Sequence, residues 1–424
     1  MTTSRRRFLA GISAATAASG LVSLSPLAPR FLAESAAWGA ELSGAGQSGE
    51  KILVVVQLSG GNDGLNTVIP FRDDRYRANR PSLAQNADTV VKVAGDLGLH
   101  PSLKSFGKLL DAKQLAIVQG VGYPNPNRSH FESMDIWHSC RTDKAGTKVD
   151  RSTGWLGRSL DLRKAAGQHD SALALHLGQE VQPLALAGHT VQCPSIRSFD
   201  QFRLDTAGNE SRRQLIESSL SPARTLDNDL LKFVSATSTS ALEVSRRMES
   251  AGEKYQTSVK YPQSGLAEKM KQIAQLIDAG LTTRIYYVAL DGFDTHSDQA
   301  GAHAALLEQL GSALAAFSDD LAAHGHADRV ATLVFSEFGR RVKENASRGT
   351  DHGAAAPAFV VGSRVKAGIL GKQPDLSDLD DGDLKFHTDF RSLYAALLQN
   401  WLGWPAEAGL GEAFQPYDLF VAKS

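Results

Sequence analysis

The fold is decided by the stretch KILVVVQLSGGND, residues 51–63. Apart from Lys51 and Gln57, its first eight residues are apolar; they are rich in β-branched side chains and too few for a helix, which is typical of a strand buried on both faces. In an open α/β sheet, ligands bind beyond the carboxyl ends of the strands. The polar residues directly after Leu58 therefore mark a candidate functional site.

Five further short apolar runs follow at residues 115–119, 172–177, 284–290, 330–335 and 358–361. Between them, apolar residues recur at steps of three and four, which predicts amphipathic helices over residues 266–277 and 307–321. Strands that alternate with helices predict an α/β fold whose mainly parallel central sheet is covered by helices on both faces. A final helix is expected to begin after the N-cap residue Thr388.

The N-terminus reads Ser4-Arg5-Arg6-Arg7-Phe8-Leu9 and continues into a mildly apolar stretch rich in alanine, glycine and serine. This pattern indicates a twin-arginine export signal over residues 1–40, with the twin-arginine machinery as partner and a periplasmic or extracellular location. A chance basic N-terminus before a core helix is the alternative. The α/β domain is assigned to residues 50–424, and residues 200–262, where strand signals disappear, to a helical insertion or cap.

Charge balance and the length of the apolar runs argue against nucleic-acid binding and against a membrane span, while the cysteines leave a disulfide open. The 45 basic and 46 acidic residues offer no general attraction to nucleic acid. Beyond the signal, no apolar run approaches the roughly 20 residues that cross a bilayer, so no membrane span is expected in the mature chain. The two cysteines, Cys140 and Cys193, could form one disulfide in an oxidising compartment, which the sequence leaves open.

Two polar junctions lie in the N-terminal half. Asp63 follows the first strand among glycines and asparagines and is a candidate ligand, although Asn-Asp-Gly is also an ordinary turn sequence. Ser129 precedes a helical pattern, where backbone N–H groups favour an anion or an alkoxide. It could also simply cap that helix together with Glu132, three residues later. The roles of cap and nucleophile are compatible, and both remain open.

Two further junctions carry possible metal ligands. Asp294 and His296 follow the predicted strand at residues 284–290, and carboxylate with imidazole suits zinc, manganese or iron. A solvated aspartate-rich turn is the alternative. After the predicted strand at residues 330–335, Glu337 lies in a Ser-Glu-Phe-Gly segment, and His352 in Asp-His-Gly supplies another imidazole.

The junctions share a pattern of five motifs: SGGNDG (59–64), NRSHF (127–131), GFDTH (292–296), FSEFGRR (335–341) and TDHG (350–353). Together they resemble the exported family called domain of unknown function 1501, within the alkaline phosphatase and sulfatase superfamily. The resemblance covers nearly the whole mature chain. It implies an alkaline-phosphatase-like α/β sandwich with a helical insertion.

The resemblance also implies a divalent metal, zinc or manganese. One metal site is complete, and its ligands match Asp294, His296 and His352. Asp63 and Glu337 match ligand positions of a second site. Phe338 stands where that second site has a histidine, so the second site is incomplete.

The resemblance further implies a reaction. Ser129 matches the position of the nucleophile, and Arg128 and His130 are available for an anionic oxygen or a proton. We therefore expect a metal-dependent hydrolase that acts on small anionic esters of phosphate or sulfate. The alternative is a non-catalytic periplasmic binding or accessory protein on a degenerate hydrolase scaffold, which the missing imidazole at Phe338 favours. Fold alone does not decide between them.

Overall fold

The computed structural model describes residues 50–143, 149–165, 173–191, 193, 195–196 and 255–422. The export signal assigned to residues 1–40 and most of the insertion assigned to residues 200–262 lie outside these residues. Among the residues that are described, no helix combines the length and the apolar character needed to cross a membrane.

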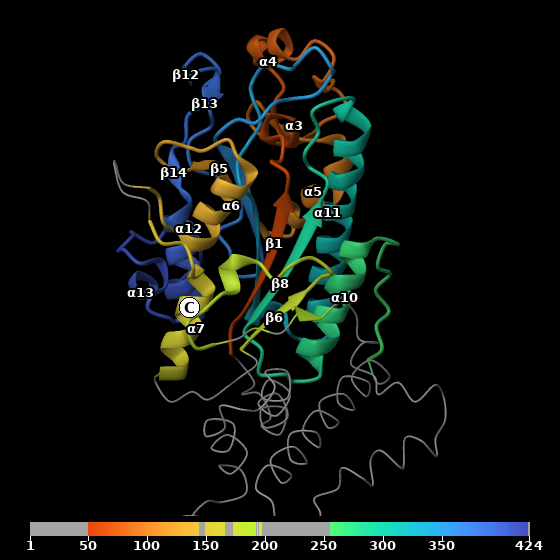
Figure 1. The fold of residues 1–424 in the computed structure, drawn as a ribbon. Coiled ribbons are helices and arrows are strands. Elements are labelled where there is room, and N and C mark those ends of the chain that lie inside the picture. The colour runs from red at the N-terminus through yellow and green to blue at the C-terminus, as the bar shows by residue number, and fades with distance from the viewer. Residues whose placement is uncertain are drawn as a thin grey trace, which may run out of the picture.

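A sheet with nine strands in the described part of the chain forms the centre of the molecule, between two layers of helices (Figure 1). Its order is β11-β5-β10-β9-β1-β8-β6-β7, and β14 pairs with β5 beside this path. The bounds are β1 (Ile52–Ser59), β5 (Leu115–Gly122), β6 (Ala174–Leu177), β7 (Ser195–Ile196), β8 (Ile285–Asp291), β9 (Val330–Ser336), β10 (Ala356–Val361), β11 (Gly368–Leu370) and β14 (Thr388–Asp389). All six runs predicted to be strands are strands of this sheet.

The central strand β1 lies between β8 and β9 and runs parallel to both. Its side chains alternate between two hydrophobic cores: Val54 and Val56 belong to one, and Leu53 and Val55 to the other. Residues 52–56 are all apolar because a strand covered on both faces has no side in contact with water. β10 runs antiparallel to β9 and β5, so the sheet is mainly but not wholly parallel.

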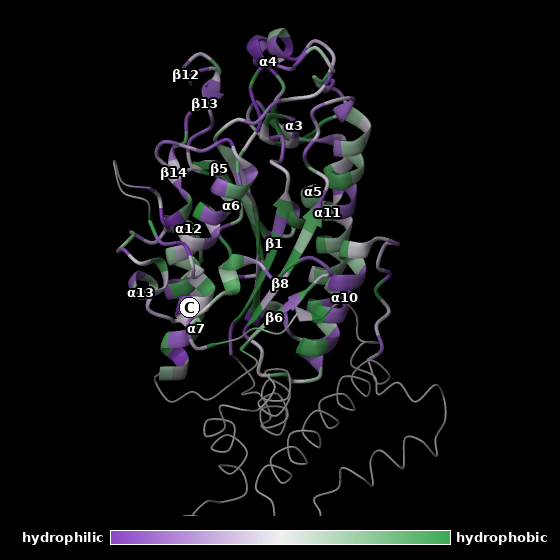
Figure 2. Cartoon of the chain, viewed as in Figure 1, coloured by the Kyte–Doolittle hydropathy of each residue, from purple (hydrophilic) through white to green (hydrophobic). Residues whose placement is uncertain are grey.

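Helices complete both cores. One face of the sheet is covered by α5 (Lys104–Asp111), α10 (Gly265–Asp278) and α11 (Gln299–Ala323). The opposite face is covered by α6 (His130–Ser139), α7 (Trp155–Ala165), α12 (Phe390–Ala395), the π-helical segment η6 (Ala396–Leu402) and α13 (Ala406–Leu410). Figure 2 shows apolar residues concentrated in the central strands. The predicted α/β architecture and the helices predicted at residues 266–277 and 307–321 are confirmed.

Shorter elements surround this core. They are α3 (Gly64–Thr67), α4 (Asp74–Asn79), a sheet of β2 (Val68–Pro70), β3 (Val91–Ala94) and β4 (Leu97–Leu99), a hairpin of β12 (Leu379–Asp380) and β13 (Asp383–Leu384), and the 3-10 turns η2 (Pro101–Leu103), η3 (Leu184–Leu186) and η5 (Ala327–Arg329). Helices α3 and α4 and the β12–β13 hairpin lie beyond the carboxyl end of β1 (Figure 1).

The structure answers two questions raised by the sequence: where the C-terminal helix begins and whether the two cysteines are bonded. The C-terminal helix begins one residue later than predicted, because Thr388 belongs to β14 and the side chain of Asp389 accepts the capping hydrogen bond from the Arg391 backbone N–H. Cys140 and Cys193 are both buried free thiols, so no disulfide joins them. Burial raises the pKa of the Cys193 thiol to about 12, which keeps it protonated.

Candidate metal centre

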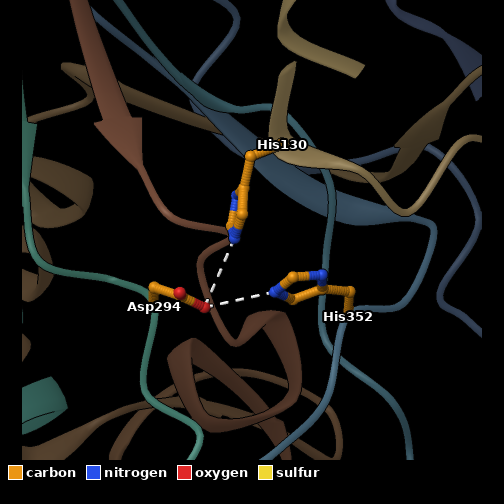
Figure 3. A group of neighbouring side chains, drawn as sticks. All are labelled: His130, Asp294 and His352. Atoms are coloured by element: carbon orange, nitrogen blue, oxygen red, sulfur yellow. Dashed lines mark hydrogen bonds and ion pairs between the residues drawn. The ribbon is translucent and has the colours of Figure 1, made fainter. Parts of the chain in front are cut away.

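Three side chains meet beyond the carboxyl ends of the central strands, and their ligand atoms all lie within 4.8 Å of one another (Figure 3). His130 is the first residue of α6, Asp294 follows β8, and His352 lies in the loop between β9 and β10. Their mutual position depends on the sheet, because parallel neighbouring strands end at the same edge. The group therefore occupies the place where an α/β protein of this kind binds its ligand.

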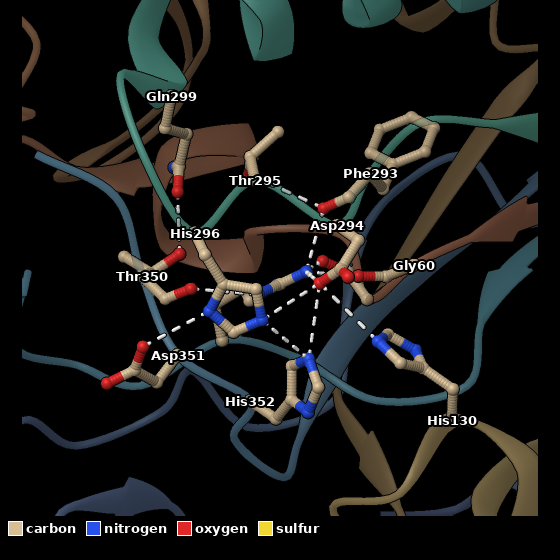
Figure 4. A network of polar contacts seen from close by, with 12 residues as sticks. Gly60, His130, Phe293, Asp294, Thr295, His296, Gln299, Thr350, Asp351 and His352 are labelled. Carbon is tan, nitrogen blue, oxygen red and sulfur yellow. Dashed lines mark hydrogen bonds and ion pairs between the residues drawn. The ribbon is translucent and has the colours of Figure 1, made fainter. Parts of the chain in front are cut away.

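Asp294 is the centre of this arrangement (Figure 4). Its Oδ1 lies 3.4 Å from Nε2 of His130, 3.0 Å from Nε2 of His296 and 3.2 Å from Nε2 of His352. Burial alone would raise the pKa of Asp294, but the hydrogen bond and the charge of Arg340 help to lower it to about 2. The carboxylate is therefore ionised, and three imidazoles face one of its oxygens.

The opposite nitrogen of each imidazole has a fixed partner. Nδ1 of His130 lies 2.9 Å from Oε1 of Glu337, and Nδ1 of His296 lies 3.2 Å from Oδ1 of Asp351. Nδ1 of His352 lies 2.8 Å from the backbone oxygen of Arg128. All three partners are acceptors, so each Nδ1 carries a proton and donates it. In the neutral imidazoles the lone pairs are then on the three Nε2 atoms that face Asp294.

The Nε2 atoms crowd together without donors between them. Nε2 of His130 is buried and has no hydrogen-bond partner in the described part of the chain. Nε2 of His296 lies 2.9 Å from Nε2 of His352. The hydrogen bond to Glu337 raises the pKa of His130, whereas burial lowers that of His352. Lone pairs held this closely are the arrangement expected of ligands around a cation.

Arg340 fixes the position of Asp294. Its guanidinium is fully buried and lies 2.8 Å from Oδ1 of Asp294. It also donates to the backbone oxygens of Gly60, Gly61, Phe293 and Thr350. One side chain thus ties the loops after β1 and β8 to the loop that carries His352. No role was predicted for Arg340 from the sequence, although it lies within the quoted FSEFGRR motif.

Glycine after β1 is a steric requirement of this packing. Gly60 has φ +114°, and a Cβ atom there would lie 2.3 Å from the backbone nitrogen of Asp294. A Cβ atom at Gly61 would lie 2.3 Å from the ring of Phe338. Any larger residue at either position would push the β1 loop away from the candidate metal centre.

Glu337 contacts the candidate metal centre through His130. It is buried, and Oε1 accepts hydrogen bonds from His130 and from the Gly60 backbone N–H, while Oε2 accepts one from Ser336. Phe338, the next residue, packs against the rings of His130 and His352 at centroid distances of 4.9 and 4.8 Å. The carboxylate thus orients an imidazole, and the phenyl ring closes one side of the centre.

The structure places Asp63 apart from this group. One carboxylate oxygen is paired with the buried guanidinium of Arg80 and also accepts a hydrogen bond from Gln299. The other caps α3 through the Asn66 backbone N–H at 3.3 Å. Burial alone would raise the pKa of Asp63, but the charge of Arg80 lowers it below its usual value. Breaking a buried pair of this kind costs about 3–5 kcal/mol, so Asp63 stabilises the loop after β1.

Ser129 and Arg128 lie at the start of α6, next to His130. Ser129 is exposed and occupies the N-cap position, but its side chain makes no capping hydrogen bond. The alternative of a capping box with Glu132 is therefore wrong. Arg128 is held by the β12–β13 hairpin, with Nη2 2.6 Å from Asp383 and 3.0 Å from Asp381. The Ser129 hydroxyl thus makes no capping hydrogen bond. The Arg128 guanidinium, in contrast, is paired with Asp381 and Asp383.

The motifs at these junctions match a known family. The family described as "Protein of unknown function (DUF1501)" matches residues 50–400. The chain belongs to the DUF1501 family. This confirms the resemblance seen in the sequence, and it places all the site residues of the DUF1501 chain inside the matched segment.

Solved structures provide a second comparison. The DUF1501 chain is similar to PsFucS1 sulfatase from Pseudoalteromonas sp., with 11% identity, a TM-score of 0.36, and coverage of 82% of this chain and 70% of that one. It is also similar to an alkaline phosphatase superfamily protein from Vibrio parahaemolyticus, with 10% identity, a TM-score of 0.37, and coverage of 95% and 78%. The zinc-bound periplasmic domain of EcEptC from Escherichia coli shares 9% identity at a TM-score of 0.36, over 74% and 73% of the two chains. No curated protein sequence matches the chain.

Proposed function

We propose that this protein is an exported, metal-dependent hydrolase of phosphate or sulfate esters. The observation that carries the proposal is the convergence of three imidazole Nε2 atoms on Oδ1 of Asp294, each imidazole being fixed through its Nδ1. Protein metal centres commonly orient their histidines in this way, through a carboxylate or a backbone carbonyl. The chemistry of the site therefore favours metal binding over a solvated turn.

The proposed ligands are His130, Asp294, His296 and His352. Three nitrogens and one oxygen suit zinc in a tetrahedral site, and manganese is the alternative. The donors fit because Nε2 of His130 is otherwise an unpartnered buried atom among the described residues. A bound divalent cation would neutralise negative charge that develops on a phosphoryl or sulfuryl group. From the sequence, His130 was expected to serve an anionic oxygen or a proton; in this proposal it binds the metal.

Glu337 and Asp63 support the centre in this proposal without binding the metal. Glu337 positions His130 through the 2.9 Å contact between Oε1 and Nδ1. Asp63 holds the loop after β1 through its pair with Arg80. With Phe338 packed against two of the ligand imidazoles, the proposal has one metal per chain.

Ser129 is the proposed nucleophile. Ser129 directly precedes the proposed ligand His130 in the chain. It is exposed, and its hydroxyl makes no capping hydrogen bond. In the proposed reaction its Oγ loses a proton and bonds to phosphorus or sulfur, while the ester oxygen leaves with a proton as the alcohol. Water then releases the inorganic anion and restores the hydroxyl. Arg128 steadies the loop that carries Ser129 through its pairs with the hairpin aspartates.

A substrate screen with metal removal tests this function. We expect the purified protein to hydrolyse at least one class among chromogenic phosphate monoesters, phosphate diesters and sulfate esters. Dialysis against a chelator should abolish the turnover because the site loses its cation, and zinc or manganese should restore it. If the fully metal-loaded protein hydrolyses none of these esters, the non-catalytic binding function is the better account.

Export is tested separately from chemistry. Replacement of both Arg5 and Arg6 with lysine should leave the precursor in the cytoplasm, because the export receptor reads the guanidinium pair rather than charge alone. Cell fractionation and immunoblotting measure the distribution. Arg7→Lys is the matched control and should be exported normally. Normal export of the double variant would contradict the twin-arginine assignment.

A further inference from the structure

A serine, a histidine and a glutamate are in contact at one edge of the central sheet. β6 and β7 run parallel to each other at the end of the described strand order, and His176 lies opposite Ser195. Oγ of Ser195 lies 3.0 Å from Nδ1 of His176, and Oε1 of Glu180 lies 3.3 Å from Nε2 of the same imidazole. The imidazole therefore connects the hydroxyl to the carboxylate, and the three residues are separate from the proposed metal ligands.

The hydrogen-bond partners of His176 determine its tautomer. Burial alone would raise the pKa of Glu180, but the hydrogen bond from His176 and the charge of Lys269 help to lower it to about 2. An ionised carboxylate can only accept hydrogen bonds, so Nε2 of the neutral imidazole carries the proton. The lone pair is then on Nδ1, where the Ser195 hydroxyl donates to it. In this arrangement an imidazole can take the proton of a hydroxyl.

Exposure to solvent differs among the three side chains. Ser195 is exposed, the side chain of Glu180 is 29% exposed, and His176 is fully buried. The imidazole lies edge-on to the ring of Tyr287 at a centroid distance of 6.4 Å, and Ser195 and Glu180 hold its two nitrogens. Molecules in solution can therefore reach the hydroxyl, while its base is fixed and shielded from water.

The alternative is that this hydrogen bond only joins β7 to β6. Within the described ranges, Ser195 is the one serine whose hydroxyl lies at hydrogen-bond distance from an imidazole. The buried hydroxyls of Ser133 and Ser336 instead donate to backbone oxygens. A backbone oxygen accepts the hydrogen bond without taking the proton, whereas an imidazole can take it. The partner of Ser195 therefore favours chemistry over a purely structural role.

The charges near the imidazole favour an uncharged substrate. Glu180 is ionised, and its partner Lys269 lies 3.5 Å away and also donates to the Ala289 backbone oxygen. An anionic phosphate or sulfate ester would be repelled by the Glu180 carboxylate, and the neighbouring ammonium group is already paired. A neutral carboxylic ester carries no such penalty.

We propose that Ser195 is the nucleophile of a second site, which takes acyl groups from neutral carboxylic esters. Oγ of Ser195 bonds to the carbonyl carbon as its proton passes to Nδ1 of His176, and the charge of Glu180 stabilises the resulting imidazolium. The bond from the carbonyl carbon to the ester oxygen then breaks, and Nδ1 returns the proton to this oxygen, so the alcohol leaves. Water attacks the acylated serine in the same way, releases the carboxylic acid and restores the hydroxyl.

Two neutral probes test the purified protein in the presence of a chelator. We expect p-nitrophenyl butyrate to release p-nitrophenolate, because the proposed site uses no metal ligand. An alkyl fluorophosphonate should form a stable adduct, since the serine oxygen displaces fluoride and bonds to phosphorus. Peptide mass spectrometry should locate this adduct on Ser195. Ser195→Ala should lose the adduct and nearly all of the nitrophenolate release.

Variants of the two supporting residues separate chemistry from structure. His176→Gln removes the base and should slow both reactions by at least about 100-fold. Glu180→Gln should slow them less, because the amide oxygen still accepts from Nε2 but no longer stabilises a positive imidazole. His326→Gln alters another histidine paired with an aspartate, and Ser377→Ala removes the hydroxyl of another exposed serine that bonds to an aspartate. Both control variants should react at the wild-type rate.

The wild type alone can contradict the inference. Ser195 should be modified in the folded protein and not after denaturation in urea, which decides the case even if His176→Gln does not fold. A folded protein whose Ser195 stays unmodified, or a folded His176→Gln that reacts at the wild-type rate, would overturn the proposal.

The same experiment distinguishes this inference from the proposed function at the metal centre. An adduct on Ser129 alone would overturn the second site and support the proposed nucleophile of the first. An adduct on Ser195 in a protein that hydrolyses no phosphate or sulfate ester would support the second site and contradict the function proposed for the first.

Discussion

Replacing His130 with alanine is expected to release the metal and abolish ester hydrolysis. The imidazole is one of four proposed ligands, and its Nε2 lies 3.4 Å from Oδ1 of Asp294. Loss of a residue that only orients a ligand already lowers metal affinity by about 10–100-fold, so loss of a ligand should exceed about 100-fold. Elemental analysis of the purified variant and titration with zinc measure the loss.

Thermal unfolding gives an independent measure of the same prediction. A metal present at about 1,000 times its Kd stabilises the folded state by about 4 kcal/mol. Zinc should therefore raise the unfolding temperature of the wild type and have little effect on His130→Ala or His352→Ala. Glu337→Gln should lie between them, because the amide oxygen still accepts from Nδ1 of His130 without the negative charge.

The control for His130 is a second histidine of the same helix. His138 is buried in α6, but its Nε2 lies 2.9 Å from Oε1 of Gln57 and 3.1 Å from the Tyr287 hydroxyl, outside the metal centre. His138→Gln should keep about one metal per chain. Full metal content in His130→Ala would show that His130 is not a ligand, and two equally occupied metals in the wild type would contradict the single centre.

Ser129→Ala is expected to remove nearly all hydrolysis while leaving stability almost unchanged. The hydroxyl is exposed and makes no capping bond, so its loss should change the free energy of unfolding by less than about 0.5 kcal/mol. Loss of a covalent nucleophile should lower kcat by at least about 1,000-fold. Ser129→Thr should keep a small part of the activity because a secondary hydroxyl can still attack.

Ser133 of the same helix is the control for Ser129, and its loss should affect stability rather than turnover. Its buried hydroxyl donates to the Glu337 backbone oxygen at 2.6 Å and lies 3.0 Å from the Tyr123 hydroxyl. Ser133→Ala should lower stability by about 1–3 kcal/mol and retain most of the turnover. If Ser129→Ala keeps most of the wild-type rate, the covalent mechanism is wrong and direct attack by water becomes the better account.

The sequence by itself determined the main architecture. Six apolar runs predicted six strands, because a strand buried on both faces is mainly apolar. The helices at residues 266–277 and 307–321 followed from their periodicity, and the five motifs indicated the family. The direction of β10 could not be read in this way. A doubly buried strand has the same apolar sequence whether it runs parallel or antiparallel to its neighbours.

The sequence also indicated Asp294, His296 and His352 as ligands of one site. Each of them lies just after a predicted strand or in a loop that leads into one. It could not show that Nε2 of His130 faces the same carboxylate, because residues 130 and 294 are brought together only by the sheet. Nor could it show that Asp63 pairs with Arg80, which had no recognisable signal.

Only the tertiary structure decided the division of roles among the polar residues. Glu337, Asp63 and Asp294 are all acidic residues that follow strands, yet one orients an imidazole, one pairs with an arginine and one faces three imidazoles. Local sequence sets which residues can ionise or ligate. Which partner each one meets depends on contacts between segments far apart in the chain, and these form only when the sheet and its two helical layers pack together.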